Sequence, residues 1–459
     1  MIHLQLATVN GINNLRILMQ EQSNVPLPGL SRRQFIKTSS LAAASAAAVF
    51  PSVLRGQGAQ AINAVIIGIG GRGGGAGGNF MEAVKATGVN GKIVAVADLF
   101  PEAARRGSEN FGVPADKCFS GFDAYRKALE VPGVNYAILA TPPGFRAAHF
   151  RACVEAGKNI FCEKPVAVDG AGARMMYESA DMAKQKGLKV AAGTQRRHQA
   201  SYIETIKRIQ DGAIGDVVAL RAYWVNGGPI WHRGDQGNTD LERQIRNWYH
   251  YIWLSGDHIC EQHVHNLDVC NWIMNSHPIS CWGQGSRQQL GDKSGEIWDN
   301  FDVEYEYPNG VHMFSYCGQI KREWASVSEA VHGTKGMADP HNMLRPKDGQ
   351  MWRFREKEVD PYVQEHIDLI NAIVKGTELN EAKQVTDSTL TAIMGREAAY
   401  SGARVSWDDV RDAKFSYGPE QLYQDCSRMQ YGEFRTLKPP MPSQHNILKE
   451  PPMLPLAKA

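Results

Sequence analysis

A short apolar segment runs directly into a glycine-rich turn in the first quarter of the chain. Residues 62–67 read Ile-Asn-Ala-Val-Ile-Ile, and Gly68, Gly70 and Gly73 then follow with the spacing G-x-G-x-x-G. This spacing lets the backbone turn tightly, approach a pyrophosphate and begin a helix whose first amide groups face the anion. Because glycines also occur in ordinary turns, the rest of the chain must decide between these two interpretations.

Short apolar runs alternate with helix-like stretches from residue 62 to about residue 190. The strand-like runs are Ala64–Ile69, Ile93–Ala97, Tyr136–Ala140, Asn159–Cys162 and Lys189–Ala192; the helix-like stretches are Phe80–Ala86, Pro101–Asn110, Ala147–Ala156 and Ala171–Lys186. Such alternation predicts a parallel, doubly wound sheet that binds ligands at the carboxyl ends of its strands. We therefore expect an α/β protein with an N-terminal Rossmann domain over residues 62–193.

The pattern changes after residue 193. Strand-like runs at Val217–Val225, Trp298–Tyr307 and Val311–Ile320 lack regular helices between them, and helices are expected at Asp257–Met274, Val363–Lys375 and Val385–Ser401. Asn309-Gly310 predicts a hairpin between the last two strands. We expect residues 194–404 to form a C-terminal α+β domain with a largely antiparallel open sheet, and residues 405–459 to form an extension that wraps the surface or a neighbouring subunit.

Composition excludes some classes of function. The net charge is +2 and no basic stripe stands out, so a nucleic-acid partner is not expected. The eight cysteines contain no C-x-x-C pair, which gives no reason to expect a metal site.

Polar residues follow several of the predicted strands. Asp98 ends the second strand, where a carboxylate binds the adenosine ribose and disfavours a 2′-phosphate. Because Leu99 and Phe100 offer no cation for such a phosphate, NAD is expected rather than NADP. The alternative role of Asp98 is an N-cap. Gly68, Gly70, Gly71, Arg72 and Gly73 complete the expected pyrophosphate site, with Arg72 as a possible direct contact.

Two further motifs carry the expected chemistry. Thr141-Pro142 and Glu163-Lys164-Pro165 each follow a strand, and a lysine before a proline is extended and can reach a substrate hydroxyl. At helical spacing Glu261, His265 and Asp268 share one face, which makes His265 a candidate acid/base. A solvated strand end and the polar face of an ordinary helix are the respective alternatives. His263 and His265 would point apart, so they predict no metal pair.

In this order, the motifs resemble the glucose–fructose oxidoreductase/inositol dehydrogenase/MocA (Gfo/Idh/MocA) family over residues 62–404. Gly212-Ala213-Ile214-Gly215, Gly333-Thr334-Lys335-Gly336 and Glu365-His366 also resemble that family. The resemblance implies a homo-oligomer, dimer or tetramer, formed through the open sheet. It also implies catalysis by Lys164, Glu261 and His265, with Pro165 often in cis.

The chain departs from this family at three positions. Glu261 stands where the family usually has Asp, and His263 stands two positions later where it usually has a small residue. Arg146 replaces the histidine that follows Thr-Pro in the family. These departures leave the substrate and the type of reaction less constrained than the fold.

An aromatic insertion follows the first strand of the second domain. Trp231, His232, Arg233, Arg246, Asn247, Trp248 and Tyr249 offer ring faces and polar edges that suit a sugar. The alternatives are a dimer contact or a small local core. Trp248 and Tyr249 are therefore candidate substrate residues, together with Arg196 and Asp268.

The first 61 residues read as a twin-arginine signal and leader. Arg32 and Arg33 precede an apolar stretch over residues 41–54 that is too short for a membrane span but fits a signal h-region. An N-terminal helix that merely begins with two arginines is the alternative. We expect export by the twin-arginine machinery to the periplasm or cell envelope, with NAD bound before export and retained.

The combined expectation is an exported NAD-dependent oxidoreductase that moves a hydride between a sugar, polyol or glycoside hydroxyl and nicotinamide. The alternative is an NAD-dependent glycosidase or lyase that oxidises its sugar only transiently. A cofactor-containing binding protein without turnover is a third possibility, which the trio of Lys164, Glu261 and His265 disfavours.

Overall fold

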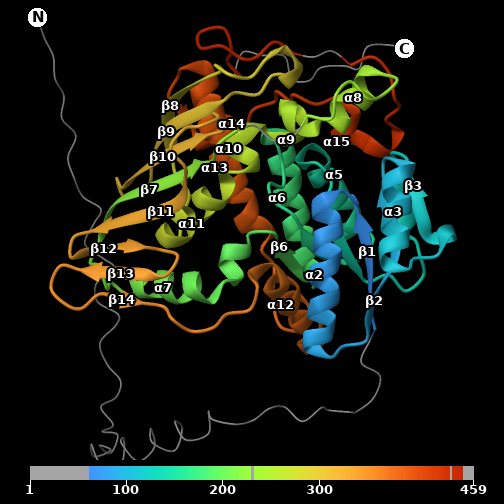
Figure 1. Cartoon of the computed structure of the whole chain (residues 1–459), viewed down its shortest axis with the longest axis horizontal. Coiled ribbons are helices and arrows are strands. Elements are labelled where there is room, and N and C mark those ends of the chain that lie inside the picture. Colours follow the sequence, from blue (N-terminus) through green and yellow to red (C-terminus); the bar gives the residue numbers. More distant parts are fainter. Residues whose placement is uncertain (1–60, 229–231, 435–436, 448–459) are drawn as a thin grey trace, which may run out of the picture. The chain divides into compact units, whose positions relative to one another are not determined.

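The computed structural model describes residues 61–228, 232–434 and 437–447 of the 459-residue chain. These residues fall within one compact unit, Ala59–Ala459. The predicted twin-arginine segment and Trp231 lie outside the described residues. Two β-sheets with their covering helices organise the described chain (Figure 1).

The first sheet has six parallel strands in the order β3-β2-β1-β4-β5-β6. They are β1 (Ile62–Ile67), β2 (Gly91–Asp98), β3 (Cys118–Ser120), β4 (Tyr136–Leu139), β5 (Asn159–Cys162) and β6 (Val190–Ala192). This is the doubly wound order of a Rossmann fold, so the predicted parallel sheet is confirmed. Only β3 was not predicted, because three half-exposed residues give no apolar run.

Helices cover both faces of this sheet. Residues of α2 (Gly71–Thr87), α3 (Pro101–Phe111) and α12 (Pro361–Lys375) share a core with one face, and residues of α4 (Ala124–Leu129), α5 (Pro143–Glu155) and α6 (Gly170–Gln185) share a core with the other. Helix α2 begins at Gly71 rather than at Phe80 as predicted. A Cβ at Gly77 would lie 2.6 Å from the side chain of Ile66, so the glycines let this helix approach β1.

The second sheet has nine strands in the order β14-β13-β12-β11-β7-β10-β9-β8-β15. Its strands are β7 (Val217–Val225), β8 (Ser280–Ser286), β9 (Asn300–Glu306), β10 (His312–Gly318), β11 (Ser326–Gly333), β12 (Gly336–Asp339), β13 (Met343–Pro346), β14 (Trp352–Arg353) and β15 (Val405–Ser406). All neighbouring strands run antiparallel except β7 and β10, and β9 and β10 form the predicted hairpin. The predicted antiparallel-rich second sheet is therefore confirmed.

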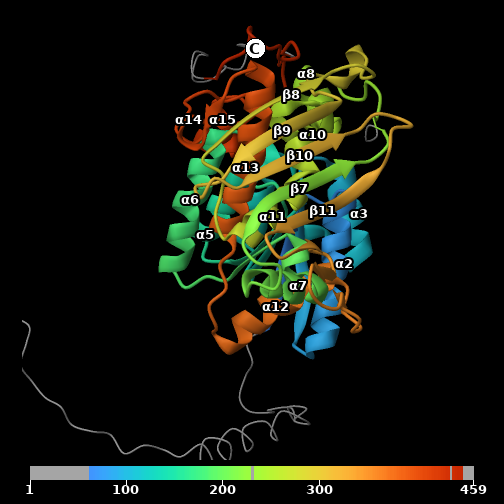
Figure 2. The ribbon, with the colours of Figure 1, turned by 90° about the vertical axis from the view of Figure 1, so that its left-hand side faces the viewer.

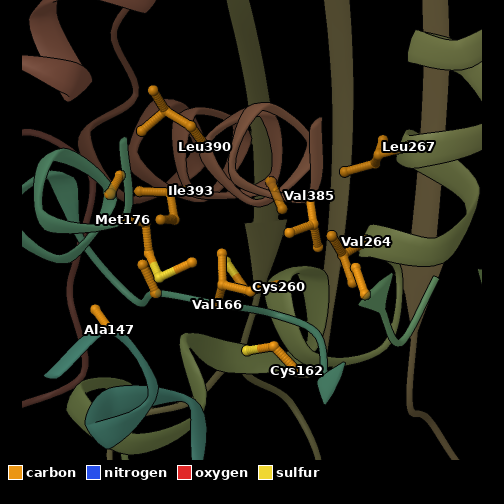
Figure 3. Packing of buried hydrophobic residues seen from close by; sticks show 14 of the residues in the cluster. Ala147, Cys162, Val166, Met176, Cys260, Val264, Leu267, Val385, Leu390 and Ile393 are labelled. Atoms are coloured by element: carbon orange, nitrogen blue, oxygen red, sulfur yellow. The ribbon is translucent and has the colours of Figure 1, made fainter. Parts of the chain in front are cut away.

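Helices lie behind this sheet when it is viewed as in Figure 2: α7 (Ala200–Gln210), α11 (Val264–Met274) and α13 (Ala382–Ser401). Helix α13 packs on both α6 and β8, and thereby joins the two sheets. Figure 3 shows Val385 and Ile393 of α13 together with Val166 and Cys162, which flank the Lys164 segment and belong to the same apolar cluster. The turn that carries Lys164 is therefore fixed by a shared apolar core.

One predicted helix is divided in two. Residues 257–274 form α10 (Asp257–Glu261) and α11, with Gln262 and His263 between them. The chain enters α10 through Gly256 and Asp257, both with positive φ. The Asp257 carboxylate accepts bonds from the backbone N–H groups of His258 (2.6 Å) and Trp298 (2.8 Å), which offset the cost of this backbone conformation.

The remaining short helices are α8 (Asp240–Arg246), α9 (Ile252–Ser255), α14 (Trp407–Arg411) and α15 (Gln421–Asp425). Within the described ranges, every helix is too short or too polar to cross a membrane.

Candidate active site

A cavity of about 630 Å³ extends from the glycine-rich loop to helices α10 and α11. Its walls come from the carboxyl ends of the first sheet's strands and from the second sheet. Of the residues predicted for the site, it is lined by Gly68, Gly70, Gly71, Arg72, Asp98, Thr141, Pro142, Glu163, Lys164, Trp248, Glu261 and His265.

The glycines of the loop have different structural roles. Gly68 has φ +88°, and a Cβ there would lie 2.6 Å from the Thr141 nitrogen; a Cβ at Gly73 would lie 1.8 Å from the Gly68 carbonyl oxygen. These two glycines are required by packing within the chain. At Gly70 and Gly71 a Cβ would meet no described atom within 4 Å, and both residues line the cavity at the start of α2. An anionic diphosphate fits this helix N-terminus.

Arg72 is held by two carboxylates and a ring. Its Nε donates to Glu163, its Nη2 lies 3.7 Å from Glu365, and its guanidinium lies 4.8 Å from the Tyr362 ring centroid. These contacts tie the loop to the Glu-Lys-Pro turn and to α12. The predicted Arg72–pyrophosphate contact stays a prediction.

Asp98 closes the ribose end of the cavity. Its carboxylate accepts hydrogen bonds from the backbone N–H groups of Ile69 (2.8 Å) and Phe100 (3.0 Å). Burial raises the pKa of this carboxyl, and the two backbone hydrogen bonds oppose that rise. Arg106 of α3 also lines the cavity, and its positive charge acts on the Asp98 carboxyl. A cation is therefore present near the ribose end, although Leu99 and Phe100 offer none.

We predict that Asp98→Asn weakens selection against NADP. Asn keeps the size of the side chain but removes the charge that repels a 2′-phosphate, and Arg106 then offers that phosphate an ion pair. The ratio of kcat/KM for NADP to kcat/KM for NAD should rise about tenfold. A further Arg106→Ala change should cancel the rise, whereas Arg105→Ala should leave it intact, because Arg105 does not line the cavity.

Three side chains that the sequence singled out meet at the other end of the cavity. Lys164 donates from Nζ to the Glu261 backbone oxygen (2.6 Å) and lies 3.4 Å from Glu261 Oε1. His265 stacks on Trp224, with ring centroids 5.7 Å apart, and its Nδ1 has no hydrogen-bond partner among the described residues. The Lys164–Pro165 peptide bond is cis.

Burial shifts the pKa values of His265 and Glu261 in opposite directions. Burial, followed by the positive charge of Lys164, lowers the pKa of His265 well below its usual value. The imidazole is therefore neutral at neutral pH and able to accept a proton. Burial raises the pKa of Glu261, and Lys164 and Arg146 act in the opposite direction.

Comparison with known proteins agrees with this arrangement. The family model described as the GFO/IDH/MocA oxidoreductase family, NAD-binding Rossmann fold, matches residues 62–194. The model of the GFO/IDH/MocA C-terminal domain matches residues 202–339. The chain belongs to the GFO/IDH/MocA family. Its first domain is an NAD-binding Rossmann domain, and the chain is classed with NAD(P)-dependent dehydrogenases.

The relatives include inositol dehydrogenases. An inositol 2-dehydrogenase of Gluconacetobacter diazotrophicus is 28% identical over 190 residues, which cover 41% of this chain and 49% of that protein. An inositol 2-dehydrogenase of Rhizobium meliloti is 24% identical over 304 residues, which cover 63% of this chain and 83% of that protein. The chain thus spans about half the length of the first of these relatives.

Solved structures share the fold. Levoglucosan dehydrogenase, in complex with NADH and levoglucosan, has a TM-score of 0.62 at 18% identity and covers 76% of this chain and 99% of its own. The aldose-aldose oxidoreductase of Caulobacter crescentus, complexed with glycerol, has a TM-score of 0.60 at 20% identity and covers 75% of this chain and 99% of its own.

Arg146, where this family has a histidine, is buried in the cavity wall. Its guanidinium donates to the backbone oxygens of Thr141 and Pro165, and so connects the turns after β4 and β5. The charged or ionisable groups around it are Cys162, Glu163, Glu261 and His149. None of these carboxylates accepts a hydrogen bond from Arg146 in the described structure, so its charge is only loosely compensated.

We predict that Arg146→Gln shifts the pH profile of the enzyme. Loss of the buried cation raises the pKa of Glu261, so the acidic limb of kcat/KM should move to higher pH by about 0.5–1 unit. Arg146→Lys keeps the charge but cannot make both hydrogen bonds to the Thr141 and Pro165 oxygens. It should therefore lower kcat without moving the acidic limb of the kcat/KM profile. A profile that shifts equally in both variants would contradict the electrostatic role.

The predicted substrate residues divide into two groups. Trp248 lines the cavity. Arg196, Tyr249 and Asp268 do not: Arg196 pairs with buried Glu329, Tyr249 donates to Gln319 (3.1 Å), and Asp268 pairs with Arg197 and accepts from Ser388 (2.7 Å). These three side chains do not line the cavity, and their predicted part in substrate binding stays a prediction. Each side chain is used to connect distant segments.

Sequence reasoning missed other residues of the cavity. Trp224 on β7, Gln262 between α10 and α11, and Tyr362 on α12 line the same end as His265. Gln262 donates to Glu261 Oε2 and so orients that carboxylate. Their position in the sequence gives no signal, because Trp224 reaches the site through the second sheet and Tyr362 through the packing of the distant helix α12 on the first sheet. Among the described residues, no group of three or more metal-ligating side chains is placed to hold a metal ion.

Proposed function

We propose that this protein is an exported, NAD-dependent oxidoreductase that transfers a hydride between a sugar, polyol or glycoside hydroxyl and nicotinamide. The observation that carries the proposal is the convergence of Lys164, Glu261 and His265 at the end of the cavity opposite Asp98. The inositol dehydrogenases among the relatives support a polyhydroxylated ring as substrate.

Each residue of the cavity has a separate role in cofactor binding or in hydride transfer. NAD, when bound, supplies the hydride acceptor, and the loop glycines with Asp98 hold its diphosphate and ribose. His265, neutral because it is buried, accepts the hydroxyl proton as the carbon–hydrogen bond gives up its hydride. Lys164 stabilises the developing alkoxide, and Glu261 holds the lysine. Trp224 and Trp248 offer apolar ring faces to the sugar.

The test is a substrate panel on the full-length purified protein. Myo-inositol, scyllo-inositol, aldoses and nitrophenyl glycosides are incubated with NAD, and reduced nicotinamide and released nitrophenol are followed together. The proposal expects reduced nicotinamide in proportion to oxidised substrate. Release of nitrophenol with no net reduction would instead support the transient-oxidation glycosidase or lyase.

The proposal of export rests on Arg32 and Arg33 and on the apolar stretch that follows them. Cell fractionation tests it: the unaltered chain should accumulate in the periplasm or cell envelope, and replacement of both arginines by lysine should retain it in the cytoplasm. Equal distribution of the two chains would overturn the proposal.

We also propose a homo-oligomer formed through the second sheet. The face of the second sheet turned away from the cavity carries exposed large side chains: Trp282 (52% exposed) and Tyr316 (38%) on the strands, and Trp324 (67%), whose ring packs on Tyr223. Exposed apolar groups on one sheet are typical of an association surface. Light scattering during gel filtration should give a dimer or tetramer, and a Trp282→Glu/Tyr316→Glu double variant should reduce the mass to that of the monomer.

A further inference from the structure

Two segments outside the Rossmann domain cover the ribose end of the cavity. The first, here called the flap, comprises residues 232–250 and includes α8. The second, here called the strap, comprises residues 412–434 and includes α15. Arg246 of the flap and Cys426 of the strap line the cavity together with Asp98 and Tyr125. The strap lies beyond the residues that either family model matches.

The flap is held down on α3 by Arg246. Its guanidinium donates to Glu102 Oε1 (2.8 Å) and stacks over the Phe100 ring at 3.9 Å from the centroid. Glu242, one turn earlier on α8, accepts a second ion pair at 2.9 Å. Because Phe100 lies two residues after Asp98, this contact closes the cavity next to the ribose site.

The strap is held down on α4 and the segment before it. Cys426 Sγ lies 3.6 Å from the Tyr125 hydroxyl, and Asp425 pairs with Arg126 at 3.0 Å. Tyr431 packs on Phe122, with ring centroids 5.3 Å apart. Phe122 and Tyr125 line the cavity together with Asp98, so the strap covers the part of the cavity wall that lies beside the flap.

The flap and the strap are joined to each other. The Leu241 N–H donates to the Gly432 oxygen (3.2 Å), and Gln244 donates to the Phe434 oxygen (3.0 Å) while it accepts from the Trp253 indole (2.8 Å). The Phe434 ring packs on Trp253, with centroids 5.2 Å apart. The two segments therefore form a continuous cover rather than two separate loops.

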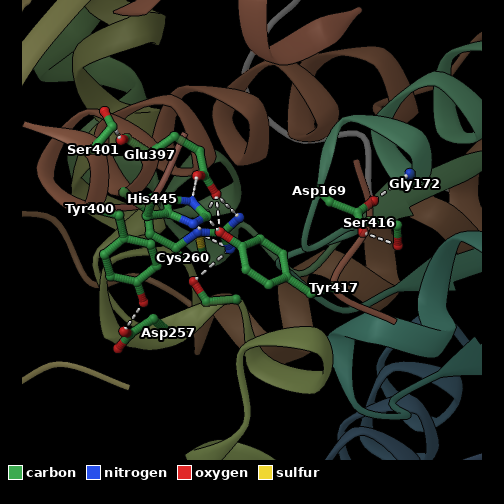
Figure 4. A network of polar contacts seen from close by, with 12 residues as sticks. Asp169, Gly172, Asp257, Cys260, Glu397, Tyr400, Ser401, Ser416, Tyr417 and His445 are labelled. Atoms are coloured by element: carbon green, nitrogen blue, oxygen red, sulfur yellow. Dashed lines mark hydrogen bonds and ion pairs between the residues drawn. The ribbon is translucent and has the colours of Figure 1, made fainter. Parts of the chain in front are cut away.

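The strap is also anchored firmly at its start. Figure 4 shows the Ser416 hydroxyl, which donates a hydrogen bond to the Asp169 carboxylate, and the Tyr417 hydroxyl, which donates one to the Glu397 carboxylate. Tyr423 donates to the other oxygen of Asp169 (2.8 Å). These acceptors are buried, so release of the strap would remove hydrogen bonds from two buried carboxylates. A cover with such anchors opens rarely.

We propose that the flap and the strap enclose the adenosine half of NAD and make the cofactor a resident group of this enzyme, exchanged only when the strap detaches. The proposal rests on the proposed function only through the identity of the cofactor. It assigns the C-terminal extension a role in cofactor retention.

The experiment measures release of NAD in the absence of any sugar. The full chain is loaded with NAD, desalted rapidly, and sampled over time for free and bound nucleotide. Phe434→Ala removes the ring that joins strap to Trp253 and lies outside the cavity wall. Arg126→Ala removes the exposed ion pair with Asp425, and its loss should raise the rate of NAD release about two- to fivefold. Arg105→Ala, on the exposed side of α3, is the matched control.

The wild-type protein and the control should retain NAD through desalting, and Phe434→Ala should release it at least tenfold faster. Hydrogen exchange should show protection of residues 421–434 on NAD binding. Loss of NAD by the wild type during desalting would overturn the proposal, as would equal release rates in all four proteins. If Phe434→Ala fails to fold, the release rate of Arg126→Ala tests the proposal instead, and a rate equal to that of the wild type would overturn it. A protein that retains NAD but oxidises no sugar would overturn the proposed function alone.

Discussion

Replacement of Lys164 by Met should lower kcat by about 10³–10⁴-fold while NAD binding persists. The methionine fills nearly the same volume, but it can neither stabilise an alkoxide nor donate to the Glu261 backbone oxygen, which Lys164 Nζ reaches at 2.6 Å. The lysine is only slightly exposed, so its loss leaves Glu261 buried without its nearest cation. Steady-state rates and nucleotide titration by calorimetry would measure the two effects.

Lys158→Met is the matched control for this prediction. Lys158 precedes β5 and donates to the Val134 oxygen (2.8 Å) away from the cavity, so its loss should leave kcat within about twofold. An equal fall in kcat for the two variants, or loss of NAD binding in Lys164→Met, would show that the lysine acts through the structure rather than in the reaction.

Replacement of Gly73 by Ala should destabilise the protein and abolish NAD binding. The added Cβ would lie 1.8 Å from the Gly68 oxygen, which is backbone and cannot rotate away. Helix α2 must therefore move off β1, which costs about 3 kcal/mol and displaces the amides that face the diphosphate. Thermal unfolding with and without NAD would report both losses.

Gly74→Ala provides the comparison, because a Cβ at Gly74 would meet no described atom within 4 Å. Alanine within a helix should be neutral or stabilise the protein by up to about 1 kcal/mol. If Gly73→Ala unfolds at the same temperature as Gly74→Ala and still binds NAD, the close packing of loop and helix is not required.

The parts of the site that lie near one another in sequence were predictable. Gly68, Gly73 and Asp98 belong to a single βαβ unit, and local chain geometry decides their roles. Lys164 follows a buried strand of the same sheet, so its place at the carboxyl edge also followed from the alternating pattern. The two sheets and the hairpin at Asn309-Gly310 were predicted for the same reason.

The parts that depend on distant partners were not predictable. Arg196, Tyr249 and Asp268 have the chemistry of sugar-binding residues, yet Glu329, Gln319 and Arg197 take up their polar groups inside the second domain. The sequence gives no sign of these pairings, because the second sheet brings the partners together. The break at Gln262 and His263 was hidden for a similar reason, since Asp257 is held by Trp298 and Tyr400 far along the chain.

The sequence indicated an aromatic insertion and an extension that wraps the surface, but it gave no sign that the two join over the ribose end. Cys426 and Tyr431 lie in a segment without apolar periodicity, and their contacts with Tyr125 and Phe122 span about 300 residues of chain. Arg106 could have been found, because a helix that begins at Pro101 places it about one and a half turns along α3, within range of an electrostatic interaction with Asp98.

The most direct test of the proposed chemistry follows the hydride itself. Myo-inositol deuterated at its ring carbons is incubated with the protein and NAD, and the nicotinamide is analysed by mass spectrometry, with the aldoses of the panel tested in the same way. The proposed function predicts reduced nicotinamide that carries one deuterium with the wild type and none with Lys164→Met. Absence of deuterium from the nicotinamide with every polyol and sugar, in a protein shown to bind NAD, would contradict hydride transfer at this site.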